Sequence, residues 1–274
     1  MRASVVQMNS TSDRDLNLEA AERLVRAAAA DGADLVVLPE KWSLLTTGER
    51  LIEGSEPIDG PAVSAARSWA EELGLHLQAG SFTESLADQA LPSNTALMIS
   101  PEGEITATYR KIHMFDVEVG GVEYSESSFE QAGDEVTVAA AGEAEVGMTI
   151  CYDLRFPELF RALLGRGADT YTVPSAFTAV TGRDHWGPLI RARAIENQSF
   201  VLAANQVGHA DPEFDSWGHS VIADPWGEII AGLQEGEGFA TADLDFESLA
   251  ETRRRLPAVE HRRPELFREP GETA

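Results

Sequence analysis

The sequence predicts an α/β fold, because short apolar strands alternate with amphipathic helices along most of the chain. Continuously apolar runs such as Leu35–Leu38 are typical of strands that are buried on both faces of a sheet. Pro61 and Pro157 each precede a helical pattern, and proline suits the first turn of a helix because it has no N–H to lose there. Buried strands of this kind need cover on both faces, so each sheet should carry a layer of helices.

The elements are expected in a regular order. Strands are expected at 2–8, 35–38, 75–79, 95–100, 104–109, 145–150, 171–173, 220–223 and 228–231. Helices are expected after Asp13 or Asp15, from Pro61, from Pro157 and over 184–199. In the first helix we expect an inward stripe of Leu16, Ala20, Leu24 and Ala27. Residues 113–135 are expected to form a loop, and a loop of that length is usually functional.

A short pattern occurs twice in the chain. Gly-Ala-Asp, an apolar strand and a proline follow one another at 32–39 and again at 167–174. A strand–turn–strand unit also occurs twice, at 95–109 and 220–231. We therefore expect two similar halves that share one core within a single domain, residues 1–274. The tail from about 252 to 274 lacks core periodicity, and we expect it to pack on a partner subunit.

The composition excludes several classes of function. The chain has 274 residues, with 46 acidic against 21 basic side chains and a formal charge of -25, which disfavours nucleic acid and anionic membranes as partners. This charge fits either a salt-rich host or a demand for solubility. No signal-peptide pattern and no apolar run of membrane-spanning length is found, so a cytoplasmic protein is expected. One cysteine excludes an internal disulfide, and no Cys/His cluster has metal spacing, so neither a metal nor another cofactor is expected.

The only cysteine, Cys151, lies between the predicted strand 145–150 and the helix from Pro157. A nucleophile at such a turn stands clear of the sheet, and the next N–H, here of Tyr152, can point at the group under attack. A helix N-terminus would also favour the thiolate over the thiol. The alternative is that Cys151 is a small buried apolar residue, the commoner fate of a free cysteine.

Glu40 and Lys111 also follow predicted strands, and ligands gather beyond the carboxyl ends of strands in α/β sheets. A buried carboxylate such as Glu40 can act as a base for a thiol, and the Lys111 ammonium can stabilise the oxyanion that forms on attack. The 21 basic residues include only two lysines, Lys41 and Lys111, so each lysine is expected to have a purpose. The alternatives are a solvated acid at a strand end and a surface ammonium.

Seven segments of the chain resemble the nitrilase superfamily of carbon–nitrogen hydrolases. They are LPEKW, YRKIHMFDVEV, GMTICYDLRFPELFR, PSAFTAVTGRDHW, RARAIENQ, GHSVIADPWGE and HRRPEL. The resemblance implies a catalytic triad of Glu40, Lys111 and Cys151, and it places a further glutamate, in YSES, at Glu126. It also implies a four-layer α-β-β-α sandwich with internal pseudo-twofold symmetry, in subunits that pair as homodimers or larger homo-oligomers.

Within the superfamily, CYDLRFPEL is more similar to Nit-type amidases than to true nitrilases, which usually carry Trp-Glu after the cysteine. The resemblance implies hydrolysis of a linear terminal amide, not a peptide bond, of a small carboxylate-bearing acid such as deaminated glutathione or an α-keto ω-amide. The products would be the acid and ammonia, formed through a cysteine thioester. The alternatives are an N-carbamoyl amidohydrolase, a nitrilase with the same triad, and a catalytically silent thiol-sensing or binding relative.

Three residues are candidates for holding the substrate. The N–H of Tyr152 would join Lys111 at the oxyanion, Arg155 would pair with a substrate carboxylate, and Thr181 would lie in the pocket. A helix-surface arginine is the alternative for Arg155. Relatives often read Thr-Gly-x-Ala-His-Trp-Glu where this chain has Thr181–Gly187, so an added Arg183–Asp184 charge pair and a missing glutamate are expected near the pocket rim. His113, His185 and His219 are expected to be structural hydrogen-bonding groups.

Overall fold

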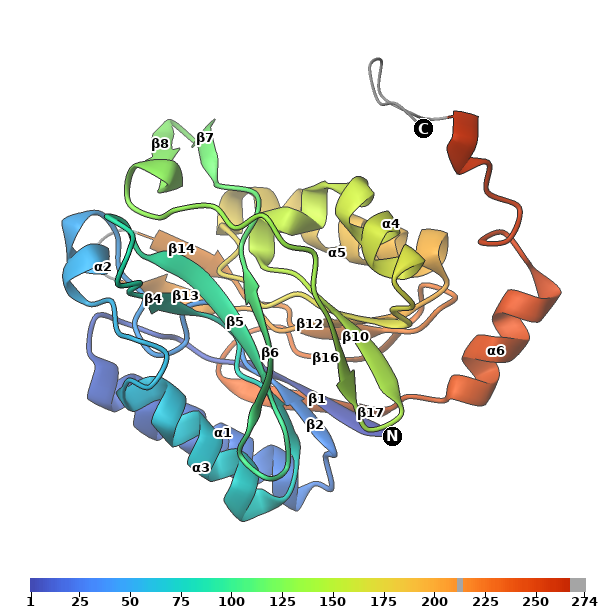
Figure 1. Cartoon of the computed structure of the whole chain (residues 1–274), viewed down its shortest axis with the longest axis horizontal. Helices are drawn as coiled ribbons and strands as arrows, with labels where there is room; N and C mark the ends of the chain where they lie inside the picture. The colour runs from blue at the N-terminus through green and yellow to red at the C-terminus, as the bar shows by residue number, and fades with distance from the viewer. Residues whose placement is uncertain (211–213, 267–274) are drawn as a thin grey trace.

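The computed structural model describes residues 1–210 and 214–266, in which two β-sheets lie between two layers of helices (Figure 1). The first sheet has the order β17-β1-β2-β3-β5-β4, with β6 paired to β5. Its strands are β1 (Arg2–Gln7), β2 (Leu35–Val37), β3 (His76–Gln78), β4 (Phe82–Glu84), β5 (Ser93–Ile99), β6 (Ile105–Arg110) and β17 (Gly238–Asp243). β1, β2 and β3 are parallel neighbours.

The second sheet has the order β16-β15-β12-β11-β10-β9. Its strands are β9 (Val138–Ala141), β10 (Ala144–Met148), β11 (Thr170–Thr172), β12 (Phe200–Ala203), β15 (Val221–Ala223) and β16 (Ile229–Gly232). β10, β11 and β12 are parallel neighbours, so each sheet is built around three parallel strands. The expected internal twofold axis and the single-domain assignment stay predictions.

The described part of the chain contains six α-helices and three short 3₁₀ turns. They are α1 (Arg14–Ala30), α2 (Glu49–Glu53), α3 (Pro61–Leu73), α4 (Pro157–Gly165), α5 (Ala179–Asn197) and α6 (Phe246–Arg255), with 3₁₀ turns η1 (Glu126–Ser128), η2 (Cys151–Arg155) and η3 (Pro264–Leu266). α1 and α3 cover the first sheet, while α4 and α5 cover the second (Figure 1). None of the helices in the described part of the chain is long and apolar enough to cross a membrane.

Two apolar clusters explain the four layers. Val6 and Val36 point outward from the first sheet and pack with α1 and α3 through residues such as Leu24 and Trp69. Their neighbours Val5 and Val37 point the other way into a second cluster, which the second sheet, α4 and α5 complete. Because successive side chains of a strand point to opposite faces, one continuously apolar strand serves both clusters. The α-β-β-α sandwich is thus confirmed.

The inward stripe expected for α1 is right at Leu24, which is buried, and at Ala20, which packs partly buried against the same cluster, but it is wrong at Leu16. Leu16 is 59% exposed, and the buried face instead runs through Asn17, Ala21, Leu24, Val25 and Ala28. The first position of this face is polar and was therefore missed: Asn17 is buried because its amide bonds the backbone of Thr11 and Ser43. The N-cap was anticipated, since the Asp13 carboxylate accepts the N–H of Leu16.

The loop expected over 113–135 contains a hairpin. β7 (Asp116–Val119) pairs antiparallel with β8 (Val122–Ser125), and η1 follows directly. Gly120 and Gly121 join the two strands with positive φ angles of 63° and 81°. A two-residue turn of this hand needs positive φ at both positions, so Gly-Gly is the sequence signal that the loop assignment overlooked.

Two helix boundaries also differ from expectation. α5 begins at Ala179 rather than Asp184, because the Thr178 side chain caps it by accepting the N–H of Thr181. α6 continues to Arg255, beyond the point where the tail was expected to begin. The chain after α6 leaves the sandwich (Figure 1), and residues 267–274 of the expected tail lie outside the described residues.

Candidate active site

The backbone turns sharply at Cys151. Its φ is +47°, a conformation that non-glycine residues rarely adopt, and it opens η2 directly after β10. The N–H of Cys151 donates to the carbonyl of Pro174 at 2.8 Å. The Asp153 carboxylate accepts the N–H of Ile150 at 2.8 Å, which holds the turn from the other side. A strained turn that is fixed at both ends presents the thiol at the wall of the pocket.

Asp153 organises a buried network behind this turn. It accepts the hydroxyl of Tyr109 at 2.6 Å and lies 2.7 Å from Nδ1 of His113. The His113 ring stacks on Phe156, with centroids 3.6 Å apart. Tyr109 and His113 flank Lys111 in the chain, so the same network ties the lysine segment to the cysteine turn. Sequence reasoning missed Asp153, because no local pattern separates a buried aspartate from an exposed one.

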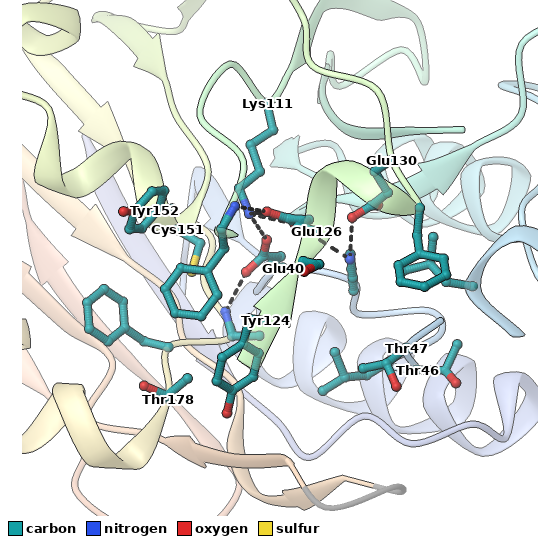
Figure 2. Close-up of a pocket in the computed structure, with 18 of the residues that line it drawn as sticks. Glu40, Thr46, Thr47, Lys111, Tyr124, Glu126, Glu130, Cys151, Tyr152 and Thr178 are labelled. Carbon is teal, nitrogen blue, oxygen red and sulfur yellow. Dashed lines mark hydrogen bonds and ion pairs between the residues drawn. The ribbon is translucent and has the colours of Figure 1, made fainter. Parts of the chain in front are cut away.

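Glu40 lies just beyond β2 and is buried. Its Oε1 accepts Lys111 Nζ at 3.0 Å and Asn94 Nδ2 at 2.8 Å, while its Oε2 accepts the N–H of Ala176 at 2.7 Å. Figure 2 shows the sulfur of Cys151 beside this carboxylate. The solvated acid that was the alternative for Glu40 is therefore not what the structure contains.

Lys111 follows β6 and is also buried, so the surface ammonium is excluded. Its Nζ donates to Glu40 and to both carboxylate oxygens of Glu126, each at 2.8 Å (Figure 2). Burial alone would lower the pKa of Lys111, but the charges of Glu126 and Glu40 outweigh burial and raise it well above its usual range. Lys111 is thus a fixed cation between two carboxylates.

The electrostatics of Cys151 correct one expectation. Burial raises the pKa of the thiol well above its usual value, the Glu40 carboxylate raises it further, and Lys111 opposes both. The helix N-terminus that was expected to favour the thiolate is not adjacent to Cys151, because α4 begins only at Pro157 and the short turn η2 lies between them. Cys151 is therefore a thiol at rest and needs a base to become a nucleophile.

Lys41 and Glu130 belong to the same buried cluster and were not assigned a role from the sequence. Lys41 Nζ lies 2.7 Å from Glu130 Oε2 and 3.8 Å from Glu126 Oε1. Lys41 also has a positive φ of 51°. The signal for Lys41 was present, because it is one of only two lysines in the chain. Glu130 had no signal, since it lies in the segment that was expected to be a loop.

A cavity of about 450 Å³ opens onto this cluster. Tyr152, Arg155 and Thr181 line it, as expected, together with Leu45, Thr46, Thr47, Gly48, Leu51, Phe115, Val122, Glu123, Tyr124, Ser125, Phe129, Ala176, Phe177, Thr178 and Ala210 (Figure 2). The Arg183–Asp184 pair does not line it: the two side chains meet at 3.3 Å on the exposed surface of α5. Among the residues of α5, only Thr181 lines the cavity.

Arg155 lies at one wall of the cavity. Its guanidinium is 5.1 Å from the centre of the Phe177 ring and 5.9 Å from that of Tyr152, and it lies 3.2 Å from Nδ1 of His185. Within residues 1–210 and 214–266 no carboxylate comes within ion-pair distance of this guanidinium. Its position against the cavity fits a group that binds a ligand better than an arginine on a helix surface.

The three histidines make the hydrogen bonds expected of structural residues. His113 contacts Asp153, His185 contacts Arg155, and Nδ1 of His219 contacts the carbonyl of Trp217 at 2.8 Å. Within the described part of the chain, no three His, Cys, Asp or Glu side chains are grouped so that they could hold a metal ion. The residues that line the pocket supply a thiol, carboxylates and ammonium groups.

Comparison with known proteins identifies relatives of this chain. The sequence profile described as carbon-nitrogen hydrolase matches residues 2–254. Deaminated glutathione amidase from Homo sapiens is 39% identical over 270 residues, covering 96% of this chain and 83% of that protein. Omega-amidase NIT2 from Xenopus tropicalis is 36% identical over 267 residues, covering 97% and 96%. The crystal structure of the C. elegans NitFhit protein superposes with a TM-score of 0.91 at 36% identity; the match covers 97% of this chain and 66% of that one.

Proposed function

The chain belongs to the carbon-nitrogen hydrolase family, and we propose that it hydrolyses an amide of a small carboxylate-bearing acid through a thioester on Cys151. The observation that supports this most is the contact of Glu40 with Lys111 at 3.0 Å beside the only thiol of the chain. A base, a cation and a nucleophile in one cavity are the groups that acyl transfer needs. Each has its own role in the reaction.

In the first half-reaction Glu40 takes the proton from Cys151, and the sulfur attacks the carbonyl carbon of the amide. The electron pair of the C=O bond moves onto oxygen, and Lys111 and the N–H of Tyr152 stabilise that oxyanion. Glu40 then gives the proton to the nitrogen as the C–N bond breaks. The acyl group remains on sulfur as a thioester.

In the second half-reaction Glu40 takes a proton from a water molecule, which attacks the thioester carbon. The new oxyanion occupies the same position and collapses as the C–S bond breaks. The acid leaves, and the sulfur recovers a proton from Glu40. Glu126 takes no proton in this scheme: Lys111 and Lys41 outweigh the effect of burial and hold its pKa at about 2, so it serves as a permanent anion that orients Lys111.

Arg155 supports a substrate that carries a carboxylate. A guanidinium at a cavity wall can bind a carboxylate through two parallel hydrogen bonds. Both relatives named above are amidases, one of deaminated glutathione and one an omega-amidase. A primary amide would release ammonia, as expected from the sequence. Deaminated glutathione carries its amides inside the chain and would release an amine, so the expectation of ammonia is corrected for that substrate.

The experiment that tests the proposal is intact-mass spectrometry after mixing the protein with a panel of amides. Because the chain has one cysteine, an added acyl mass that is absent from Cys151→Ala identifies the thioester. Released ammonia and amine are measured on the same samples, with ureas and nitriles included in the panel. Turnover of ureas or nitriles alone would favour the N-carbamoyl hydrolase or nitrilase, and a protein without any adduct or turnover would be a silent relative.

We also propose a homodimer or larger homo-oligomer. Trp226 is 59% exposed, and Ile229 and Ile230, which follow it in the chain, and Ile195, which lies beside Gly227, are exposed as well. Several large apolar side chains exposed near one another mark an interface more often than bare solvent. Multi-angle light scattering should report a dimer or larger assembly for the wild type. For Trp226→Asp it should report a smaller species. The reduced thiol that the mechanism needs is consistent with the cytoplasmic location expected from the sequence.

A further inference from the structure

Buried charges alternate in a row behind the candidate oxyanion site. The row runs from Glu40 through Lys111, Glu126 and Lys41 to Glu130, with successive contacts of 3.0, 2.8, 3.8 and 2.7 Å. The mechanism uses only its first three members. All five line the same cavity, and Figure 2 shows Glu130 on the side of Glu126 that faces away from Cys151. Two buried, ionisable groups at the end of this row are thus without an assigned role.

We propose that Lys41 and Glu130 are positioning residues that act through Glu126 to set how much positive charge Lys111 presents to the substrate oxygen. This inference rests on the oxyanion role proposed above for Lys111. Interactions between charges are strong in such a place, because water is excluded and screening is weak.

The role of Lys41 follows from the charge balance. When the oxyanion forms, Glu40 holds the thiol proton and is uncharged, and Lys111 bonds both oxygens of Glu126, so the Lys111–Glu126 pair is formally neutral. An oxyanion beside Lys111 would then face a neutral pair, and it would gain less than from a free ammonium. Lys41 lies 3.8 Å from the same carboxylate and restores one net positive charge to the group.

Glu130 decides whether that charge remains. One carboxylate oxygen contacts Lys41, and the other, Oε1, is buried with no hydrogen-bond donor among the described residues. Burial raises the pKa of Glu130 to about 7, and Glu126 adds to the effect while Lys41 and Lys111 oppose it. Below that pH the Glu130 carboxyl is neutral, and the net positive charge that Lys41 supplies stays. Above it, the Glu130 carboxylate cancels the charge of Lys41.

The rate at which iodoacetamide alkylates Cys151 tests this charge without any substrate. The thiolate is the reacting form, and its sulfur interacts with Lys111 much as an oxyanion would. The chain has one cysteine, so intact mass reports this reaction alone. The rate is followed across the neutral range for the wild type, Lys41→Met, Lys41→Arg, Glu130→Gln and Glu56→Gln.

Lys41→Met should raise the pKa of the Cys151 thiol by about half a unit or more. The thiolate fraction then falls, and alkylation at neutral pH slows roughly threefold. Lys41→Arg keeps the charge and should recover most of the rate. Glu130→Gln should match the wild type at about pH 6 and react faster at about pH 8.5, because it cannot acquire the cancelling charge. With an amide substrate, Lys41→Met should lower kcat about tenfold while KM changes little.

Glu56→Gln is the matched control, since Glu56 is another buried carboxyl whose pKa is raised by burial, but it lies outside the cavity. It should keep the wild-type profile. Alkylation of Lys41→Met at the wild-type rate overturns the inference, and so does a Glu130→Gln profile that follows the wild type at alkaline pH. If Lys41→Met fails to melt cooperatively, Lys41→Arg and Glu130→Gln decide. An absence of amide turnover in the wild type would refute the proposed function and leave the alkylation result standing.

Discussion

The two Gly-Ala-Asp segments have the same local structure but supply different chemistry to the pocket. Asp34 and Asp169 each accept an N–H near the start of the neighbouring strand, from Arg2 at 2.7 Å and from Glu145 at 3.1 Å. Each aspartate is followed by the middle strand of three parallel strands, β2 or β11, and then by a proline. The repeated letters therefore encode a strand that ends at the site.

The chemistry differs one residue after the proline. After β2 the chain supplies the carboxylate of Glu40. After β11 it supplies backbone groups: the carbonyl of Pro174 accepts the N–H of Cys151, and the N–H of Ala176 donates to Glu40. One segment thus carries the proposed base, and its counterpart holds both that base and the nucleophile in place. A repeat determines where a strand ends, and the side chain at its end determines what it does there.

Glu40→Gln removes the carboxylate that distinguishes the segment after β2, and it should have the largest effect on activity. Glutamine keeps the size of the side chain and can still accept the N–H of Ala176, but it cannot take a proton. We expect kcat/KM to fall by roughly 10²–10⁴-fold, the usual contribution of a general base. Steady-state kinetics measure the loss, and a thermal melt close to that of the wild type is the control. Activity within a few fold of the wild type would remove Glu40 from the role of base.

Lys111→Arg keeps the charge between the two carboxylates but changes its geometry. The wild-type ammonium is buried and contacts Glu40 and Glu126 at once, whereas a planar guanidinium is larger and directs its donors differently. Losing one oxyanion donor typically costs about 2.7–4 kcal/mol, so kcat should fall roughly 10²–10³-fold. A variant with near-normal kcat would show that charge alone suffices and that the position of the donor is unimportant.

Arg155→Ala tests the cavity wall that Arg155 forms with Tyr152 and Phe177. A charge-assisted hydrogen bond contributes about 1.5–3 kcal/mol, so KM for carboxylate-bearing amides should rise roughly ten- to a hundredfold. Neutral amides of similar size should be affected little. If KM rises equally for both kinds of substrate, Arg155 matters for packing against Tyr152 and Phe177 rather than for recognition of the carboxylate.

The smallest effects are expected from Gly32→Ala and Gly167→Ala, which probe the part that the two segments share. Both glycines have positive φ, 88° and 97°, and a Cβ would meet nothing closer than 3.7 Å at Gly32 and nothing within 4 Å at Gly167. Only the backbone conformation should cost energy, about 1–2 kcal/mol in each case. The melting temperatures of the two variants should therefore fall by similar amounts, and kcat should be unchanged. Clearly unequal losses would mean that the two turns are not equivalent.

Much of the site followed from residue type and from position relative to strands. Glu40, Lys111 and Cys151 were expected at strand ends, and the structure brings all three to one buried pocket. The signal was local, because a polar residue directly after an apolar strand must lie at the edge of a sheet. Lys41 could have been found in the same way, since it is rare by type and follows β2.

Other parts could not have been predicted. Asn94 and Asp153 are buried because of their partners Glu40 and Tyr109, which lie 54 and 44 residues away in the chain. Glu130 acquires a raised pKa only because the fold covers it. The sign of the shift at Cys151 was also out of reach, because it depends on burial and on Glu40 rather than on the helix that follows in sequence.

Local sequence was enough to locate the strand and helix periods, the glycine and proline boundaries, and the residue types that stand at the ends of strands. These features depend on neighbours within a few positions, and such neighbours are legible in a single chain. Only the tertiary structure decided which charges touch, which backbone groups serve the pocket and which acids are buried. Those properties depend on distances between segments that are far apart in sequence, and the strength of each interaction depends on how completely the fold excludes water.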